Sequence, residues 1–171
     1  MSNLKEKYPH EIETILKKYP SQRKRSALLP LLNLAQKETG SLSEADIEEI
    51  AEITDTSLTD VISVASFYTL FHLEEGGTYR IQICTDLPCV LRGSMDYLQE
   101  VCNYLGVKAG QTTPDGLFTV EEVKCLAACH RAPVFQLQGK GEIQYFENQS
   151  LASTQQIIDQ IRQAHREEVQ S

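Results

Sequence analysis

The sequence predicts an α+β protein, with an N-terminal helical bundle in residues 1–77 followed by a sheet-containing domain in residues 78–171. Apolar residues repeat at helical spacing up to residue 68, whereas residues 79–83 alternate as in a β-strand and open a region of strands and helices. Between these regions lies Glu74-Glu75-Gly76-Gly77-Thr78, where charges and paired glycines interrupt both patterns. A chain of 171 residues with 41% hydrophobic residues can bury the core of one domain or of two small ones.

Two stripes of apolar side chains predict the first two helices of the bundle. The first stripe covers residues 12–19 at spacings of three and four, and Pro20-Ser21 ends it. The second covers residues 28–35, with Gly40 as a C-terminal stop. Pro30 falls inside the second stripe, so we expect this helix to begin close to it or to bend there.

Two further helices are expected before the boundary. Ser43 and Asp46 have the spacing of a variant capping box and open a third helix through residues 47–51. An apolar stripe over residues 61–68 predicts a fourth helix, and the aromatic side chains of residues 67–71 are expected to extend it. We interpret these stripes as core positions of the bundle, with no cofactor role.

The second region has the element order β-α-β-β-β-α. The predicted strands are 79–83, 117–123, 133–137 and 142–146, and the predicted helices are 94–105 and 150–165. Ser94 is expected to cap the first of these two helices. Pro114-Asp115-Gly116 predicts a turn, and Gly139-Lys140-Gly141 predicts a hairpin between the last two strands.

Charge and composition exclude several classes of protein. The formal net charge is −8 and the isoelectric point is about 5.0, which disfavours nucleic-acid binding, and Arg23-Lys24-Arg25 is best interpreted as a solvated helix face. No segment has the 18 or more apolar residues that a membrane span requires, and residues 1–10 do not resemble a secretory signal. We therefore expect a soluble, cytoplasmic protein whose cysteines are reduced or bound to metal.

The cysteines form two pairs that each follow a predicted strand. Cys84 and Cys89 have C-x4-C spacing, and Cys125 and Cys129 have C-x3-C spacing. If the two strands are neighbours in one sheet, the loops that leave them can converge. Such loops also bring backbone N–H groups close to the sulfurs, and these donors stabilise a negatively charged cluster.

Spacing alone leaves several uses of these thiols open. Four thiolates can hold a [2Fe–2S] cluster, with two sulfurs on each iron, or a structural zinc ion. A redox dithiol is the weakest alternative because neither pair is C-x-x-C, and reduced core thiols are the remaining one. The spacing also differs from that of plant-type ferredoxins. Cys102, inside a predicted helix, is interpreted as a buried apolar residue, and His130 as a neighbour of the centre.

Beyond these patterns, five segments match a known family. They are 24–32 (KRSALLPLL), 64–68 (VASFY), 83–89 (ICTDLPC), 110–119 (GQTTPDGLFT) and 123–133 (VKCLAACHRAP). On these segments the chain resembles the 24 kDa, or E, subunit of NADH:quinone oxidoreductase (respiratory complex I). The resemblance covers almost the whole chain, and its most specific part is the cysteine pattern with its flanks.

The resemblance implies a thioredoxin-like domain with a mixed four-stranded sheet behind the N-terminal helical bundle. It also implies one [2Fe–2S] cluster on Cys84, Cys89, Cys125 and Cys129. In the family, glycine usually stands where this chain has Ala127. Alanine is strained there if the backbone has positive φ, and is tolerated if glycine only allows close approach.

The family also implies the partners. The cluster exchanges electrons with the FMN of a flavoprotein subunit that binds NADH, in the peripheral arm of a membrane-bound respiratory complex. The helical bundle is expected to dock on that flavoprotein. Related subunits occur in NAD-linked hydrogenases and formate dehydrogenases, so these assemblies stay open. This chain has no G-x-G-x-x-G dinucleotide motif, and we expect it to be a non-catalytic subunit with no active site of its own.

Overall fold

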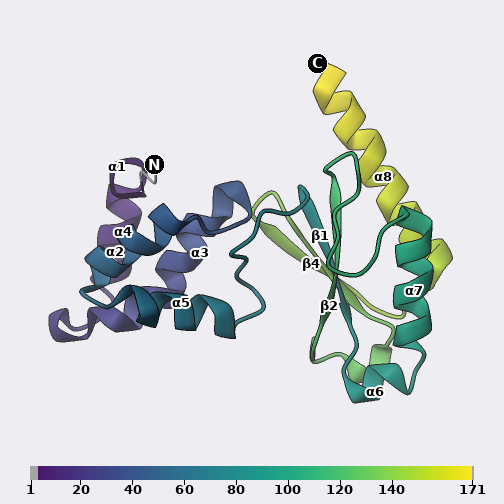
Figure 1. Cartoon of the computed structure of the whole chain (residues 1–171), viewed down its shortest axis with the longest axis horizontal. Helices are drawn as coiled ribbons and strands as arrows, with labels where there is room; N and C mark the ends of the chain where they lie inside the picture. Colours follow the sequence, from purple (N-terminus) through teal and green to yellow (C-terminus); the bar gives the residue numbers. More distant parts are fainter. Residues whose placement is uncertain (1–3, 171) are drawn as a thin grey trace. The chain divides into compact units, whose positions relative to one another are not determined.

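The computed structural model describes residues 4–170, which form two compact units that divide between Glu75 and Gly76 (Figure 1). Each unit is described by itself below. The predicted α+β class is confirmed, because helices alone build the first unit and a mixed sheet with helices builds the second. That residues 1–77 and 78–171 are separate domains stays a prediction from the sequence.

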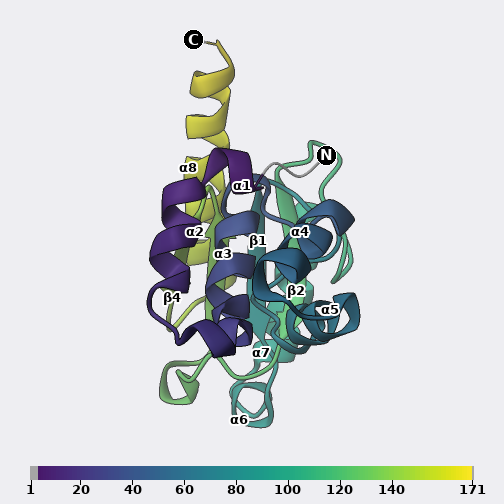
Figure 2. The same ribbon diagram turned by 90° about the vertical axis from the view of Figure 1, so that its left-hand side faces the viewer.

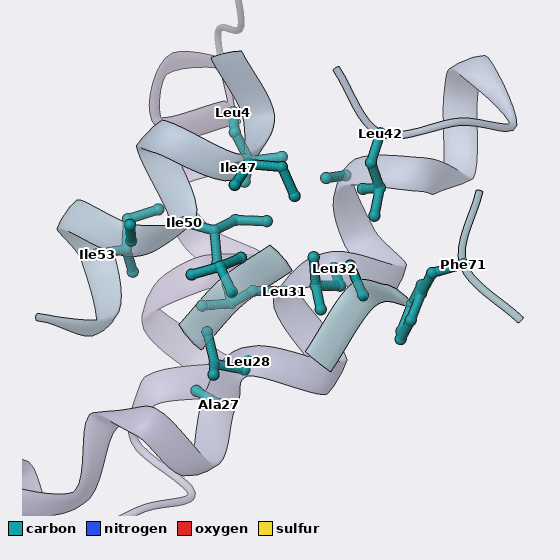
Figure 3. Close-up of a cluster of buried hydrophobic side chains, with 14 of the residues drawn as sticks. Leu4, Ala27, Leu28, Leu31, Leu32, Leu42, Ile47, Ile50, Ile53 and Phe71 are labelled. Atoms are coloured by element: carbon teal, nitrogen blue, oxygen red, sulfur yellow. The ribbon is translucent and has the colours of Figure 1, made fainter. Parts of the chain in front are cut away.

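The first unit is a bundle of short helices. They are α1 (Leu4–Lys7), α2 (Pro9–Leu16), the 3₁₀ helix η1 (Ser21–Ala27), α3 (Leu28–Thr39), α4 (Glu44–Thr54) and α5 (Leu58–Phe67). Helix α3 lies at the centre and contacts α2, α4 and α5 (Figure 2). Leu31, Leu32 and Ile50 are fully buried in the core between these helices (Figure 3). The apolar stripes of the sequence are therefore core positions, as predicted.

Local signals explain most of the helix ends in this unit. The Ser43 hydroxyl accepts a hydrogen bond from the backbone N–H of Asp46, whose carboxylate in turn accepts from the backbone N–H of Ser43, so the predicted capping box is present. Helix α3 ends at Gly40, also as predicted. Pro30 lies in the first turn of α3, where a backbone N–H has no acceptor within the helix.

The predicted extension of the fourth helix through its aromatic residues is wrong. Helix α5 ends at Phe67, and Tyr68 is extended, with φ −97° and ψ 117°. The bend lets Phe71 reach the core of the bundle, and the Tyr68 and Phe71 rings make an edge contact with centroids 6.5 Å apart. Burial of Phe71 thus overrides the helical spacing of the aromatic side chains.

The second unit is a sheet covered by helices on one face. Its elements are β1 (Tyr79–Cys84), α6 (Leu87–Val90), α7 (Ser94–Leu105), β2 (Phe118–Val123), the 3₁₀ helix η2 (Cys129–Arg131), β3 (Phe135–Gly139), β4 (Glu142–Phe146) and α8 (Leu151–Gln170). The strand order is β2-β1-β3-β4. Strands β1 and β2 are parallel, whereas β3 is antiparallel to both β1 and β4. The predicted order of strands and long helices is confirmed, and the single-turn helix α6 is an addition.

The two faces of the sheet differ in chemistry. Helices α7 and α8 cover one face (Figure 1), where Ile81, Phe118 and Phe135 are buried with residues of both helices. The other face carries a polar network in which the Gln82 amide donates to Glu121 at 2.8 Å. No helix within residues 4–170 is both long enough and apolar enough to cross a bilayer.

The N-terminus of α7 corrects one prediction. The capping position is Gly93, with φ 85°, and Ser94 is instead the first residue of the helix. Ser94 is fully buried, and its hydroxyl has no hydrogen-bond partner in the described part of the chain. Because glycine permits this left-handed backbone, the capping position is Gly93, one residue earlier than predicted. A buried hydroxyl without a partner destabilises a fold by about 1–3 kcal/mol.

Ser94→Ala should therefore raise the free energy of unfolding by about 1 kcal/mol, measured by urea denaturation. Thr154→Val is the matched control, because the Thr154 hydroxyl is also buried but bonds the Tyr97 hydroxyl at 2.6 Å and the Ser150 carbonyl at 3.0 Å. The control should lower the same free energy by about 1–2 kcal/mol. A loss of stability in Ser94→Ala would show that the hydroxyl does have a partner.

Candidate metal centre

Both cysteine loops leave the sheet at the same end. In the parallel pairing, Cys84 at the end of β1 lies opposite Val123 at the end of β2. The pairing continues one residue further, since the Thr85 backbone N–H donates to the Val123 carbonyl at 2.9 Å. The Cys84 backbone N–H donates to the Val134 carbonyl at 3.1 Å. The hydrogen bonds of the sheet therefore fix the position of Cys84 and that of Val123, which lies two residues before Cys125.

Helix α6 turns the second cysteine inward. The Asp86 carboxylate caps this helix by accepting from the backbone N–H of Leu87 at 2.9 Å. The turn places Cys89 in the interior with no exposed surface, while Leu87 and Leu91 are 69% and 80% exposed. Leu87 is therefore too exposed to shield the centre within this chain. Leu126 does pack against the buried cysteines.

The structure brings three of the four predicted ligands into direct contact. Side-chain hydrogen bonds link Cys84 to Cys89 and Cys89 to Cys129. Cys84 and Cys89 are buried with Ala128, Ala132 and Val134, and Cys129 is half-buried. Cys125 lies in the same loop, where its backbone N–H bonds the Cys84 sulfur and its own thiol is exposed.

The surroundings of the two buried thiols shift their pKa values in opposite directions. Burial raises the pKa of Cys84, but backbone N–H bonds from Asp86, Leu126 and Cys125, with a bond from the Cys89 thiol, outweigh it, and the net pKa is lowered. Burial, with the nearby sulfurs of Cys84 and Cys129, raises the pKa of Cys89 to about 12. The N–H donors are those that the sequence analysis expected around the sulfurs. Ionising both thiols requires added positive charge, which a bound metal provides.

The donor set fits a binuclear cluster. The thiol contacts run from Cys84 to Cys89 to Cys129, and Cys125 lies in the same loop as Cys129. In a [2Fe–2S] cluster each iron takes only two protein sulfurs. Four cysteines on two loops, with N–H donors aimed at a buried sulfur, supply the chemistry that such a cluster needs.

The other residues considered in the sequence lie either apart from the centre or beside it. Cys102 lies apart, on α7, and is buried in the apolar core between the sheet and its helices, as predicted for an apolar cysteine. His130 and Arg131 are exposed; the Arg131 Nε–H donates to His130 Nε2 at 3.2 Å, and Arg131 pairs with Glu147. The contact between Thr85 and Lys124 was not predicted, although Thr85 directly follows Cys84 and Lys124 directly precedes Cys125 in the sequence.

The loop after β2 has a left-handed backbone at Cys125 and at Ala127, with φ values of 54° and 57°. Of the two explanations for the usual glycine at position 127, the structure favours strain, because an L-residue in this conformation costs roughly 1–2 kcal/mol. Part of that cost is offset because alanine loses less backbone entropy on folding than glycine does.

Ala127→Gly should raise the free energy of unfolding by about 0.5–1 kcal/mol in thermal or urea denaturation. The matched control is Ala128→Gly, because Ala128 is buried and has φ −122°. That control should lower stability, since glycine gains nothing at a negative φ. Equal losses in both variants would contradict the assignment of strain to Ala127.

Comparison with known proteins identifies the family of the chain. The family model described as thioredoxin-like [2Fe–2S] ferredoxin matches residues 12–162. The chain is 43% identical over 150 residues to the E-type subunit of NADH-quinone oxidoreductase from Rickettsia prowazekii, covering 86% of this chain and 82% of that protein. It is 40% identical over 153 residues to NADH dehydrogenase [ubiquinone] flavoprotein 2, mitochondrial, of Dictyostelium discoideum, covering 89% of this chain and 60% of that protein.

Solved structures show the same fold. The chain superposes on an NAD+-reducing [NiFe]-hydrogenase in its air-oxidized state with a TM-score of 0.65 and 19% sequence identity, covering 80% of this chain and 23% of the hydrogenase chain. At that identity the likeness concerns the fold alone. The family match and the identities to the curated relatives carry the assignment: the chain belongs to the thioredoxin-like [2Fe–2S] ferredoxin family and, within it, to the E-type subunits of NADH-quinone oxidoreductase.

Proposed function

We propose that this chain is an electron-transfer subunit that carries one [2Fe–2S] cluster on Cys84, Cys89, Cys125 and Cys129. The observation that carries the proposal is the meeting of two strand-end loops, which buries Cys84 and Cys89 next to Cys129 with backbone N–H groups aimed at the Cys84 sulfur. A bound cluster of this type supplies a reversible one-electron carrier.

The residues of the chain act on the site in three ways. The four thiolates hold the irons, and α6 and the loop after β2 fix their positions. The N–H groups of Asp86, Cys125 and Leu126 stabilise negative charge on sulfur. Packing by Leu126 and Val134 keeps water from the inner side of the site. No proton transfer or substrate pocket is required of a carrier, so we propose a non-catalytic subunit.

The family resemblance and the names of the relatives support a proposal for the partner. We propose that the cluster exchanges electrons with the FMN of an NADH-binding flavoprotein subunit, and that both belong to the peripheral, cytoplasmic arm of a membrane-bound NADH-quinone oxidoreductase. Names of curated relatives support this, because they are subunits of such oxidoreductases at 40–43% identity. The alternative is a hydrogenase-type NAD-linked assembly, in keeping with the fold of the solved hydrogenase.

Replacing any of Cys84, Cys89, Cys125 or Cys129 by Ala should lower the iron and acid-labile sulfide bound per chain at least roughly fivefold, because one iron then lacks a thiolate. Iron and sulfide analysis with visible absorbance measures the loss. Cys102→Ala is the matched control, since Cys102 is buried in a different apolar core, and it should keep full iron and sulfide. Full occupancy in Cys125→Ala would show that Cys125 is not a ligand. A colourless wild-type protein with one bound zinc ion would favour the structural zinc site instead.

The flavoprotein proposal predicts that NADH reduces the cluster only when the partner is present. The full chain should stay oxidised with NADH alone, and should be reduced when NADH and the flavoprotein subunit from the same genome are both added. Absorbance changes of the cluster report this, and dithionite serves as the control that the cluster is reducible. Failure of reduction with a flavoprotein that binds NADH and FMN would contradict this partner.

A further inference from the structure

A lysine connects the two cysteine loops at the point where they leave the sheet. Lys124 directly precedes Cys125, and Thr85 directly follows Cys84. The Lys124 ammonium donates to the Thr85 hydroxyl at 2.8 Å and lies 3.4 Å from the Thr85 carbonyl oxygen. The contact thus joins the residue that follows the first ligand of one pair to the residue that precedes the first ligand of the other.

A carboxylate completes this bridge. Glu122, near the end of β2, forms an ion pair with Lys124 and accepts a hydrogen bond from the Thr85 hydroxyl. Thr85 is 5% exposed, so its hydroxyl is held in place by the fold. The Lys124 side chain is 63% exposed, so water and salt weaken the electrostatic effect of its charge on nearby groups.

The position of this charge matters because reduction adds an electron to a site that already carries four thiolates. A cation next to the site stabilises the reduced form more than the oxidised form. Lys124 and Arg131 each pair with a carboxylate, Glu122 and Glu147 respectively. Lys124 differs in that it also binds Thr85, the neighbour of a ligand on the other cysteine loop. The contacts therefore give Lys124 a positional role, and loss of its charge would leave the Glu122 carboxylate without its cation beside the cysteine loops.

We propose that Lys124 is a positioning residue that holds the two cysteine loops together and, through its charge, raises the reduction potential of the cluster. The inference rests on the proposed function, since it requires a cluster at this site. The site needs no direct contact between the lysine and iron, because the clamp acts through Thr85 and the charge acts through space.

Redox titration of the full-length chain tests this inference. Lys124→Met removes the clamp and the charge, Lys124→Gln keeps a donor for Thr85 without the charge, and Lys124→Arg keeps both. Lys140→Met is the control for charge loss elsewhere, because Lys140 lies in the β3–β4 hairpin and pairs with Glu168. The rate of iron release to a chelator is measured in parallel as the report on loop positioning.

In Lys124→Met and Lys124→Gln, the reduced-to-oxidised ratio at the wild-type midpoint potential should fall at least threefold, which is about 28 mV at ~59 mV per tenfold for a one-electron couple. The shift should shrink when salt is raised from roughly 50 mM to 500 mM, because added ions screen an exposed charge. Iron release should be at least threefold faster in Lys124→Met, and Lys124→Arg and Lys140→Met should match the wild type in both measurements.

A merely structural contact gives a different pattern. If iron release accelerates while the midpoint of Lys124→Met and Lys124→Gln stays at the wild-type value, the inference is overturned. A shift in Lys124→Arg as large as that in Lys124→Gln also overturns it. Failure of the proposed function is visible beforehand, because the wild-type chain would then hold no iron cluster to titrate.

Discussion

Parallel pairing between β1 and β2 is the constraint on which the candidate centre depends. Because the two strands run in the same direction with Cys84 opposite Val123, the loops that follow them start side by side. An antiparallel pairing would send the two loops to opposite ends of the sheet, and the cysteine pairs could not meet. The remaining features of the site, including α6 and the Lys124–Thr85 contact, act on loops that this pairing has already brought together.

In the two cysteine loops, burial of the thiols and hydrogen bonds to them have opposite effects on their ionisation. Apolar packing around Cys84 and Cys89 excludes water, which by itself disfavours thiolates. Backbone N–H groups from both loops offset this at Cys84, whereas the pKa of Cys89 is raised, so positive charge from a bound metal would favour ionisation of both thiols. The left-handed residues Cys125 and Ala127 shape the loop that supplies two of these donors. Local strain and thiolate stabilisation are thus two consequences of one loop conformation.

Much of this arrangement could be predicted from the sequence. Capping at Ser43, the order of strands and long helices along the chain and the hairpin at Gly139 each depend on local signals, and these predictions hold. The family resemblance gave the thioredoxin-like fold, because the cysteine pattern with its flanks is specific. The end of α5 and the start of α7 could not be predicted from periodicity. Burial of Phe71 and the left-handed Gly93 decide them, and both depend on tertiary packing.

The inward position of Cys89 and the outward position of Leu87 were also beyond the sequence, because they follow from the single turn of α6. Anaerobic redox titration of the full chain, followed by electron paramagnetic resonance with iron and sulfide analysis, tests the central claim most directly. The account predicts two irons and two sulfides per chain, and a spin-½ signal after addition of one electron. Protein with one tightly bound zinc, or with no metal after anaerobic purification and reconstitution, would contradict it.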